Sequence, residues 1–89
     1  MSTYRLAYTR DFEKALRRLD RPVQRRVLAA LVALTELEDP TAKLKPPRGS
    51  KVGLWRLRIG DYRAIVEVRR NELTIVALDT DHRSRIYEE

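Results

Sequence analysis

The sequence predicts an α+β domain with the element order β-α-α-β-β-β, in which a small, mostly antiparallel sheet carries an N-terminal helical hairpin on one face. Two observations support this prediction. Apolar residues recur at helical spacing between residues 10 and 38, and apolar and β-branched residues dominate the segments 54–69 and 73–78. The chain has 89 residues, which is the size of one domain, so we expect a single domain over residues 1–89.

The N-terminal half is expected to form one strand and two helices. Residues 3–8 alternate in polarity and are rich in aromatic side chains, as in a strand. Thr9 is a typical N-cap for a first helix over residues 10–19, whose apolar side chains form a narrow stripe. Pro22 fits the first turn of a second helix, which has a broad apolar stripe over residues 23–38. The proline that follows this stripe ends the helix, because the residue before a proline is steered away from helical geometry.

Residues 54–69 predict a β-hairpin that turns at Gly60 and Asp61. In this register Arg58 faces Arg63, and Arg56 lies on the same face of the hairpin. Like charges directly opposite one another destabilise a sheet by up to roughly 1 kcal/mol. The guanidinium groups therefore either extend into water or hold an anion. The other face is a core face made of Trp55, Leu57, Ile59, Tyr62, Ala64, Val66 and Val68.

The segments around the hairpin are a loop, a turn and a last strand. Residues 41–52 contain prolines, glycine and four cationic residues, and they predict a loop that begins with a short helical turn. A turn at residues 70–72 leads to residues 73–78, which are apolar on both faces, as expected of a central strand. Residues 79–89 form a polar tail.

The charge balance points to a polyanionic partner. Nineteen basic side chains against thirteen acidic ones give a net charge of +6, which attracts nucleic acid, the ribosome or an acidic protein. The chain has no cysteine, so disulfides and thiolate metal sites are excluded, and a reducing cytoplasm is the expected location. We expect neither a membrane span nor a signal peptide, because no apolar run approaches ~18 residues and no charged-then-apolar leader follows Met1.

The side chains available for chemistry are arginines, tyrosines and one histidine. His82 has Asp79 and Asp81 beside it, which are too few ligands for a convincing metal site, and the glycines fit no phosphate-binding loop. We therefore expect no metal and no cofactor. This set of side chains suits RNA cleavage by a neighbouring 2′-hydroxyl, because arginine donates two hydrogen bonds to phosphate and an aromatic ring stacks on a base.

The element order, the hairpin LWRLRIGDYRAIVEV and the tail DHRSRIY resemble the RelE/ParE superfamily of bacterial toxins from type II toxin–antitoxin systems. RelE-type mRNA interferases match best, and the resemblance covers essentially the whole chain. It implies a ribosome-dependent endoribonuclease that cuts mRNA in the A site by 2′-hydroxyl attack without a metal, and so inhibits translation. The implied partners are the ribosome, mRNA and a cognate antitoxin, through which the toxin would reach operator DNA. No membrane is implied.

The resemblance also implies roles for individual residues. Arg63 would hold the scissile phosphate, and Arg83 would stabilise the transition state or protonate the leaving oxygen. Tyr87 would stack on a base or help to activate the nucleophile, and His82 would act as an acid or base. Well-studied members have lysines at the positions of Arg56 and Arg58, and arginine effectively cannot act as a base, so His82, Tyr87 or electrostatics alone must replace them. The residues expected to bind RNA are Arg56, Arg58, Lys51 and Arg85.

Other interpretations remain open at this point. The chain could be a ParE-type toxin that inhibits DNA gyrase and has no nuclease activity, or an inactive relative that binds only its antitoxin. Arg63 could simply pair with Glu67, and Tyr87 could be fixed at the sheet edge. His82 could be a surface histidine, and Trp55 is expected to pack in the core rather than stack on a base. The basic residues of the helices are either a solvated face or a docking surface for RNA or antitoxin.

Overall fold

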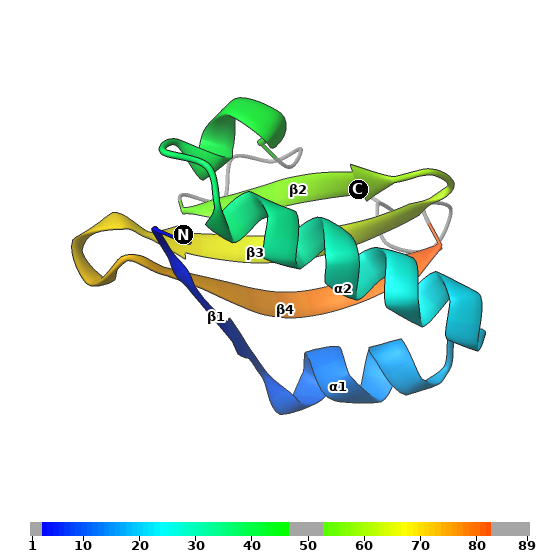
Figure 1. The fold of residues 1–89 in the computed structure, drawn as a ribbon. Helices are drawn as coiled ribbons and strands as arrows, with labels where there is room; N and C mark the ends of the chain where they lie inside the picture. The colour runs from blue at the N-terminus through cyan, green and yellow to red at the C-terminus, as the bar shows by residue number, and fades with distance from the viewer. Residues whose placement is uncertain (1–2, 47–52, 83–89) are drawn as a thin grey trace.

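The computed structural model describes residues 3–46 and 53–82, which form a four-stranded sheet with two helices on one face (Figure 1). The strand order is β1-β4-β3-β2, with β1 parallel to β4 and the other pairs antiparallel. The predicted fold class and element order are therefore confirmed. The elements are β1 (Arg5–Tyr8), α1 (Arg10–Arg17), α2 (Arg21–Thr35), the 3₁₀ turn η1 (Pro40–Lys43), β2 (Leu54–Ile59), β3 (Tyr62–Arg69), the 3₁₀ turn η2 (Arg70–Glu72) and β4 (Thr74–His82).

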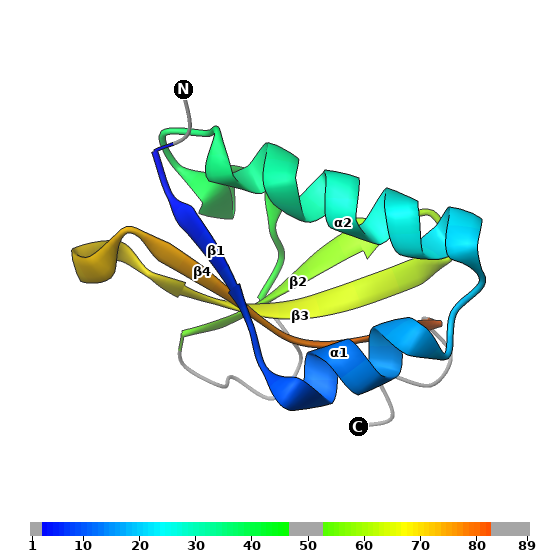
Figure 2. The same ribbon diagram turned by 60° about the horizontal axis from the view of Figure 1, so that its bottom comes forward.

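The core lies between the helical pair and the sheet. Helices α1 and α2 run in opposite directions, with α1 beside β4 and α2 in contact with β1 and β2 (Figures 1 and 2). Phe12 of α1 and Leu31 of α2 are fully buried against Val66 and Ile75 of the sheet. Among the described residues, neither helix is long and apolar enough to cross a membrane.

Thr9 fixes the start of α1, as the sequence predicts. Its Oγ1 accepts a hydrogen bond of 3.0 Å from the Phe12 backbone N–H and donates one of 3.2 Å to the Leu78 carbonyl of β4. One hydroxyl thus caps the helix and ties it to the central strand. The helix itself ends at Arg17, two residues before the predicted end, because the next two N–H groups bond three residues back in a tight final turn.

Helix α2 begins at Arg21, two residues before its apolar stripe, and also ends earlier than predicted. Pro22 lies in its first turn, where the missing N–H costs nothing. The last helical residue is Thr35 rather than residue 38. The Thr35 carbonyl accepts hydrogen bonds of 2.9 and 3.0 Å from the N–H groups of Thr3 and Tyr4, so the helix end is joined to the segment before β1.

The predicted hairpin register is correct. Arg58 pairs with Arg63 and Ile59 pairs with Tyr62 around a turn in which Gly60 has a φ of 60°. This positive φ explains the glycine, because other residues adopt that region at a cost. The face that was predicted to be apolar lies against the helices, where Leu57, Ala64 and Val66 are buried and the other four residues are packed against the core.

Strand β4 continues to His82, four residues beyond the predicted end. A β-bulge accounts for the difference: Val66 pairs with Ala77 while Ile65 pairs with Asp79, so Leu78 has no partner in the ladder. After this extra residue Thr80 returns to the core face, where it is fully buried and its hydroxyl donates a hydrogen bond of 3.0 Å to the Arg63 carbonyl. Polar residues therefore remain within a buried strand because their hydrogen bonds are satisfied.

Asp79 follows the bulge and lines a pocket of about 260 Å³ between α1 and β4. Burial raises the pKa of its carboxyl above the usual 3.8, against a hydrogen bond from the Thr80 N–H, and the nearby Asp81 and Asp11 raise it further. The folded protein therefore binds this proton more tightly than the unfolded chain, and the carboxyl lowers stability as the pH rises from 3.8 through the folded-state pKa.

Asp79→Asn should remove this pH-dependent penalty while keeping the oxygen that accepts from Thr80. We expect the melting temperature of the variant, relative to the parent, to increase as the pH rises from below 3.8 to neutrality. Thermal unfolding of both proteins over that range measures the difference. A difference that stays constant with pH, or that changes in the opposite direction, contradicts this account.

Candidate functional site

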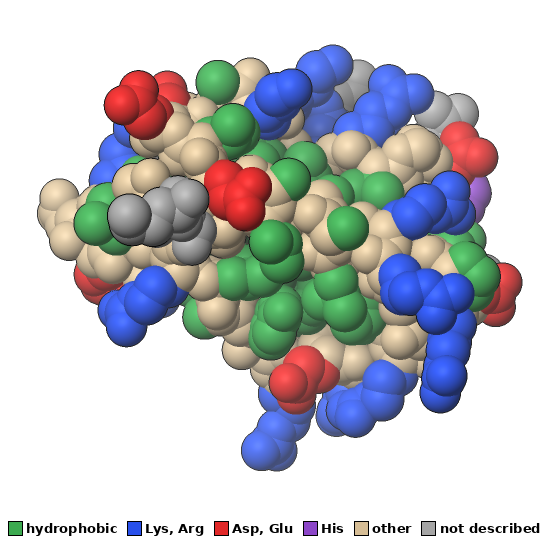
Figure 3. Space-filling view, viewed as in Figure 1, with side chains coloured by type: hydrophobic (Ala, Val, Ile, Leu, Met, Phe, Trp, Pro, Cys, Tyr) green, Lys and Arg blue, Asp and Glu red, His purple; other side chains and the backbone are tan. Residues whose placement is uncertain are grey.

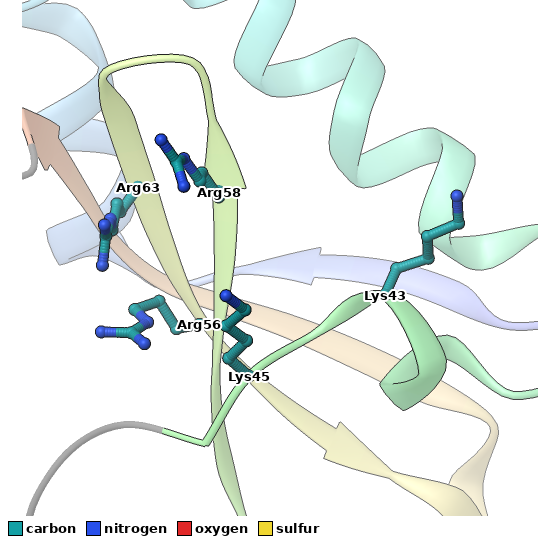
Figure 4. Close-up of a pocket in the computed structure, with 5 residues that line it drawn as sticks. All are labelled: Lys43, Lys45, Arg56, Arg58 and Arg63. Carbon is teal, nitrogen blue, oxygen red and sulfur yellow. The ribbon is translucent and has the colours of Figure 1, made fainter.

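Five cationic side chains line a small pocket on the side of the hairpin that faces away from the core (Figure 4). They are Lys43, Lys45, Arg56, Arg58 and Arg63. The volume of about 60 Å³ suits a small anionic group, since pockets for drug-sized ligands are roughly 300–1,000 Å³. None of the described residues that line it is acidic. The arrangement can bind a phosphate and stabilise additional negative charge on it.

Three of the cations come from the hairpin. Arg58 and Arg63 are direct cross-strand partners, and Arg56 lies two residues before Arg58 on the same face. Arg63 and Arg56 are half-buried, whereas Arg58 is exposed. On its other side Arg63 is paired with Asp81 of β4, so its neighbours across the sheet are one cation and one carboxylate. Arg63 therefore lies between a cation on β2 and a carboxylate on β4. Its pairing with Arg58 is the one that the sequence register predicts.

The other two cations come from the segment before β2, and the sequence reasoning did not select them. Lys45 forms an isolated antiparallel bridge with Arg56: its N–H donates to the Arg56 carbonyl at 3.0 Å, and the Arg56 N–H donates back at 2.7 Å. Between the two lysines Leu44 is buried, with 7% of its surface exposed. The Lys-Leu-Lys alternation is the signal that could have identified a short strand with outward-facing cations.

His82 lies on the opposite face from the arginines. It pairs with Tyr62 across the sheet, and the two rings are in edge-to-face contact with a centroid distance of 5.3 Å. Since successive residues of a strand point to opposite faces, Tyr62 and His82 point toward the helix side while Arg63 points away. The structure therefore does not bring His82 together with the arginine cluster.

The remaining expectations divide by location. The sequence left open an ion pair between Arg63 and Glu67. In the structure the carboxylate of Glu67 makes an ion pair of 3.3 Å with Arg69. Trp55 is half-buried and packs against the core, as predicted. Within residues 3–46 and 53–82 no three His, Cys, Asp or Glu side chains form a group that could hold a metal ion. Four residues that were expected in the site lie outside the described residues: Lys51, Arg83, Arg85 and Tyr87.

Comparisons with known proteins connect this fold to bacterial and archaeal toxins. Residues 6–87 match the family described as the ParE toxin of type II toxin–antitoxin system, parDE. Toxin RelG of Mycobacterium tuberculosis is 34% identical over 85 residues, which are 92% of this chain and 98% of RelG.

Two solved structures extend this similarity. The toxin–antitoxin complex RelBE2 from Mycobacterium tuberculosis contains a chain with 27% identity and a TM-score of 0.80, covering 94% of this chain and 95% of that one. The archaeal RelE–RelB complex from Pyrococcus horikoshii contains a chain with 31% identity and a TM-score of 0.73, covering 93% and 98% respectively.

Proposed function

Because this chain belongs to the RelE/ParE superfamily of toxins from type II toxin–antitoxin systems, we propose that it is a ribosome-dependent endoribonuclease that cuts mRNA in the A site. The observation that carries the proposal is the pocket in which Arg58 and Arg63, paired across the hairpin, share one space with Arg56 and two lysines. Cationic side chains that line one small pocket attract an anion, and a phosphodiester matches both the size and the charge of the pocket.

The proposed reaction is a transesterification at phosphorus. The 2′-hydroxyl of the nucleotide before the cut gives up its proton as its oxygen bonds to phosphorus. The bond to the 5′-oxygen of the next nucleotide breaks and that oxygen takes up a proton, which leaves a cyclic phosphate and a 5′-hydroxyl. Arg63 holds the phosphate with its planar fork and stabilises the charge that builds on the phosphate oxygens in the transition state. Arg83 adds a second guanidinium or supplies the proton, and Tyr87 stacks on a base or helps to activate the nucleophile. Arg56 and Arg58, together with Lys51 and Arg85, bind the RNA.

A cognate antitoxin is the second partner in this proposal. RelBE2 and the archaeal RelE–RelB pair are complexes of that kind. On the helix side of this chain, hydrophobic side chains gather between α1 and α2, with Lys and Arg to the right of and below them and a few acidic side chains at the margin (Figure 3). Tyr8 and Val32 are large hydrophobic residues with exposed fractions of 44% and 49%. An antitoxin segment with apolar and acidic residues that folds as it binds would fit such a surface. Through this antitoxin the toxin would associate with operator DNA in the cytoplasm.

Inhibition of DNA gyrase is the second candidate function. It is favoured by the family match, which names the ParE toxin. In that case the basic pocket would contact a protein or DNA surface, and the arginines would have no role in cleavage.

Mapping of mRNA 5′ ends in a translating extract separates the two functions. We expect the purified toxin to produce new 5′ ends inside coding sequences at the ribosomal A site, while the same message without ribosomes stays largely intact. EDTA at a concentration that leaves ribosomes assembled should not protect the message. Cleaved DNA together with intact mRNA would support gyrase inhibition and overturn the nuclease proposal.

A further inference from the structure

We propose that Lys45 binds a second backbone phosphate of the RNA, next to the phosphate held by Arg63. The toxin would then bind at least two consecutive phosphates. This subsite rests on the proposed function, because it gives the same pocket a longer substrate. It assigns a positioning role to a lysine that lies outside the hairpin and outside the motifs of the sequence.

The backbone fixes where Lys45 lies. Its two hydrogen bonds with Arg56 continue the sheet by one bridge beyond β2. Directly paired residues in an antiparallel bridge point to the same face, so Lys45 and Arg56 share the face that carries Arg58 and Arg63. Figure 4 shows the ammonium group of Lys45 beside Arg56, whereas Lys43 is set apart from the other four side chains.

The segment that carries Lys45 is anchored by the residues before it in the chain and by the bridge to Arg56. Leu44 is buried in the core directly before it. Turn η1 is capped by Asp39, which accepts from the backbone N–H and the hydroxyl of Thr41, and Arg70 of η2 contacts both of these residues at 3.4 and 3.1 Å. Asp39 and Arg70 are more than half exposed, so their ion pair adds little stability, and the position of Lys45 depends mainly on Leu44 and the bridge.

The row of cations extends beyond the position of a single phosphate held by Arg63. Neighbouring strands lie about 4.8 Å apart, and Lys45 is two such spacings from β3, with β2 between them. The backbone of Lys45 is therefore about 10 Å across the sheet from the strand that carries Arg63. The cations therefore form a row that starts at Arg63, crosses β2 at Arg58 and Arg56, and ends at Lys45. One phosphate at Arg63 leaves Lys45 at the far end of this row, where the next phosphate along the RNA backbone meets it.

The test compares short RNAs that carry one or two phosphodiesters. The probes are a dinucleotide and a trinucleotide with 2′-deoxy sugars at each potential cleavage position, titrated into the full chain and followed by NMR. The parent should bind the trinucleotide more tightly than the dinucleotide. Lys45→Ala should lower the affinity for the trinucleotide roughly tenfold and leave the affinity for the dinucleotide unchanged. With a longer single strand, the slope of log affinity against log salt should fall by about 0.7 in the variant.

Two matched variants control for charge. Arg5→Ala removes one positive charge on β1, at the opposite edge of the sheet, and should leave both measurements unchanged. Lys45→Arg keeps the charge and should retain the trinucleotide affinity. Lys45 is exposed and its bridge uses only backbone atoms, so the alanine variant should fold.

The outcomes separate this inference from the proposed function. If the parent cleaves mRNA in the extract and Lys45→Ala keeps the parent's trinucleotide affinity and salt slope, the second subsite is wrong and the nuclease stands. If the parent cleaves no mRNA and its RNA binding does not depend on salt, the nuclease proposal and the subsite both fail. A Lys45→Ala loss that appears equally with the dinucleotide places Lys45 at the same phosphate as Arg63 and overturns the two-phosphate subsite.

Discussion

Replacing Arg63 with alanine is expected to lower ribosome-dependent mRNA cleavage by about 10²–10³-fold, the typical cost of removing one donor that stabilises transition-state charge. Arg63 is half-buried and is paired with Arg58 on β2 and Asp81 on β4, and no other described cation occupies its position. Single-turnover cleavage of an mRNA on programmed ribosomes measures the loss directly. Antitoxin binding should change little, because the proposed antitoxin surface is on the helix side of the sheet.

Two control variants make this result specific. Arg69→Ala removes a cation from the same strand, but Arg69 is paired with Glu67 and Glu72 at the other end of the hairpin, so cleavage should stay close to the parent's. Arg63→Lys keeps the charge without the two-pronged donor and should recover only part of the activity. Full cleavage by Arg63→Ala, with normal folding, would remove Arg63 from the mechanism.

Phe12→Ala is expected to cost about 3–5 kcal/mol of the free energy of unfolding, as other large-to-small changes of buried aromatic residues do. Phe12 is completely buried, and its ring stacks on Tyr8 with a centroid distance of 5.3 Å. Domains are stable by only about 5–15 kcal/mol in total, so this variant should be partly unfolded at physiological temperature.

Urea unfolding of the parent and the Phe12→Ala variant measures the difference. Val32→Ala is the matched control, because Val32 is also apolar and helical but 49% exposed, and it should shift the midpoint much less. A loss below about 1 kcal/mol for Phe12→Ala would mean that α1 is not held on the sheet through this ring.

The hairpin could be predicted residue by residue because its alternation has a single solution. A shift of one position would move Leu57 and Ala64 out of the core and bury Arg58 and Arg63, so the apolar pattern and the Gly60 turn agree on one register. The N-cap at Thr9 and the proline in the first turn of α2 are equally local signals. Local patterns of this kind were also sufficient to predict the fold class.

The parts that escaped prediction depend on contacts between distant segments. The extension of β4 through Thr80 requires a bulge and a hydrogen bond to the Arg63 carbonyl. Neither feature produces a recognisable residue pattern in the sequence. Lys45 joins the site through a bridge to Arg56, eleven positions away in the chain, and a single bridge leaves no periodicity to detect. The face of His82 follows from the same bulge, so its separation from the arginines could not be read from the motif.

The unpaired Leu78 sets the phase of the chain that follows it. Because Leu78 is left out of the ladder, Thr80 turns inward and Asp81 turns outward to lie next to Arg63. If Leu78 instead paired with Ile65 in a regular ladder, Thr80 would lie opposite Arg63 and Asp81 would turn into the core. The bulge at Leu78 thereby determines whether Arg63 has a carboxylate or a neutral hydroxyl side chain opposite it on β4.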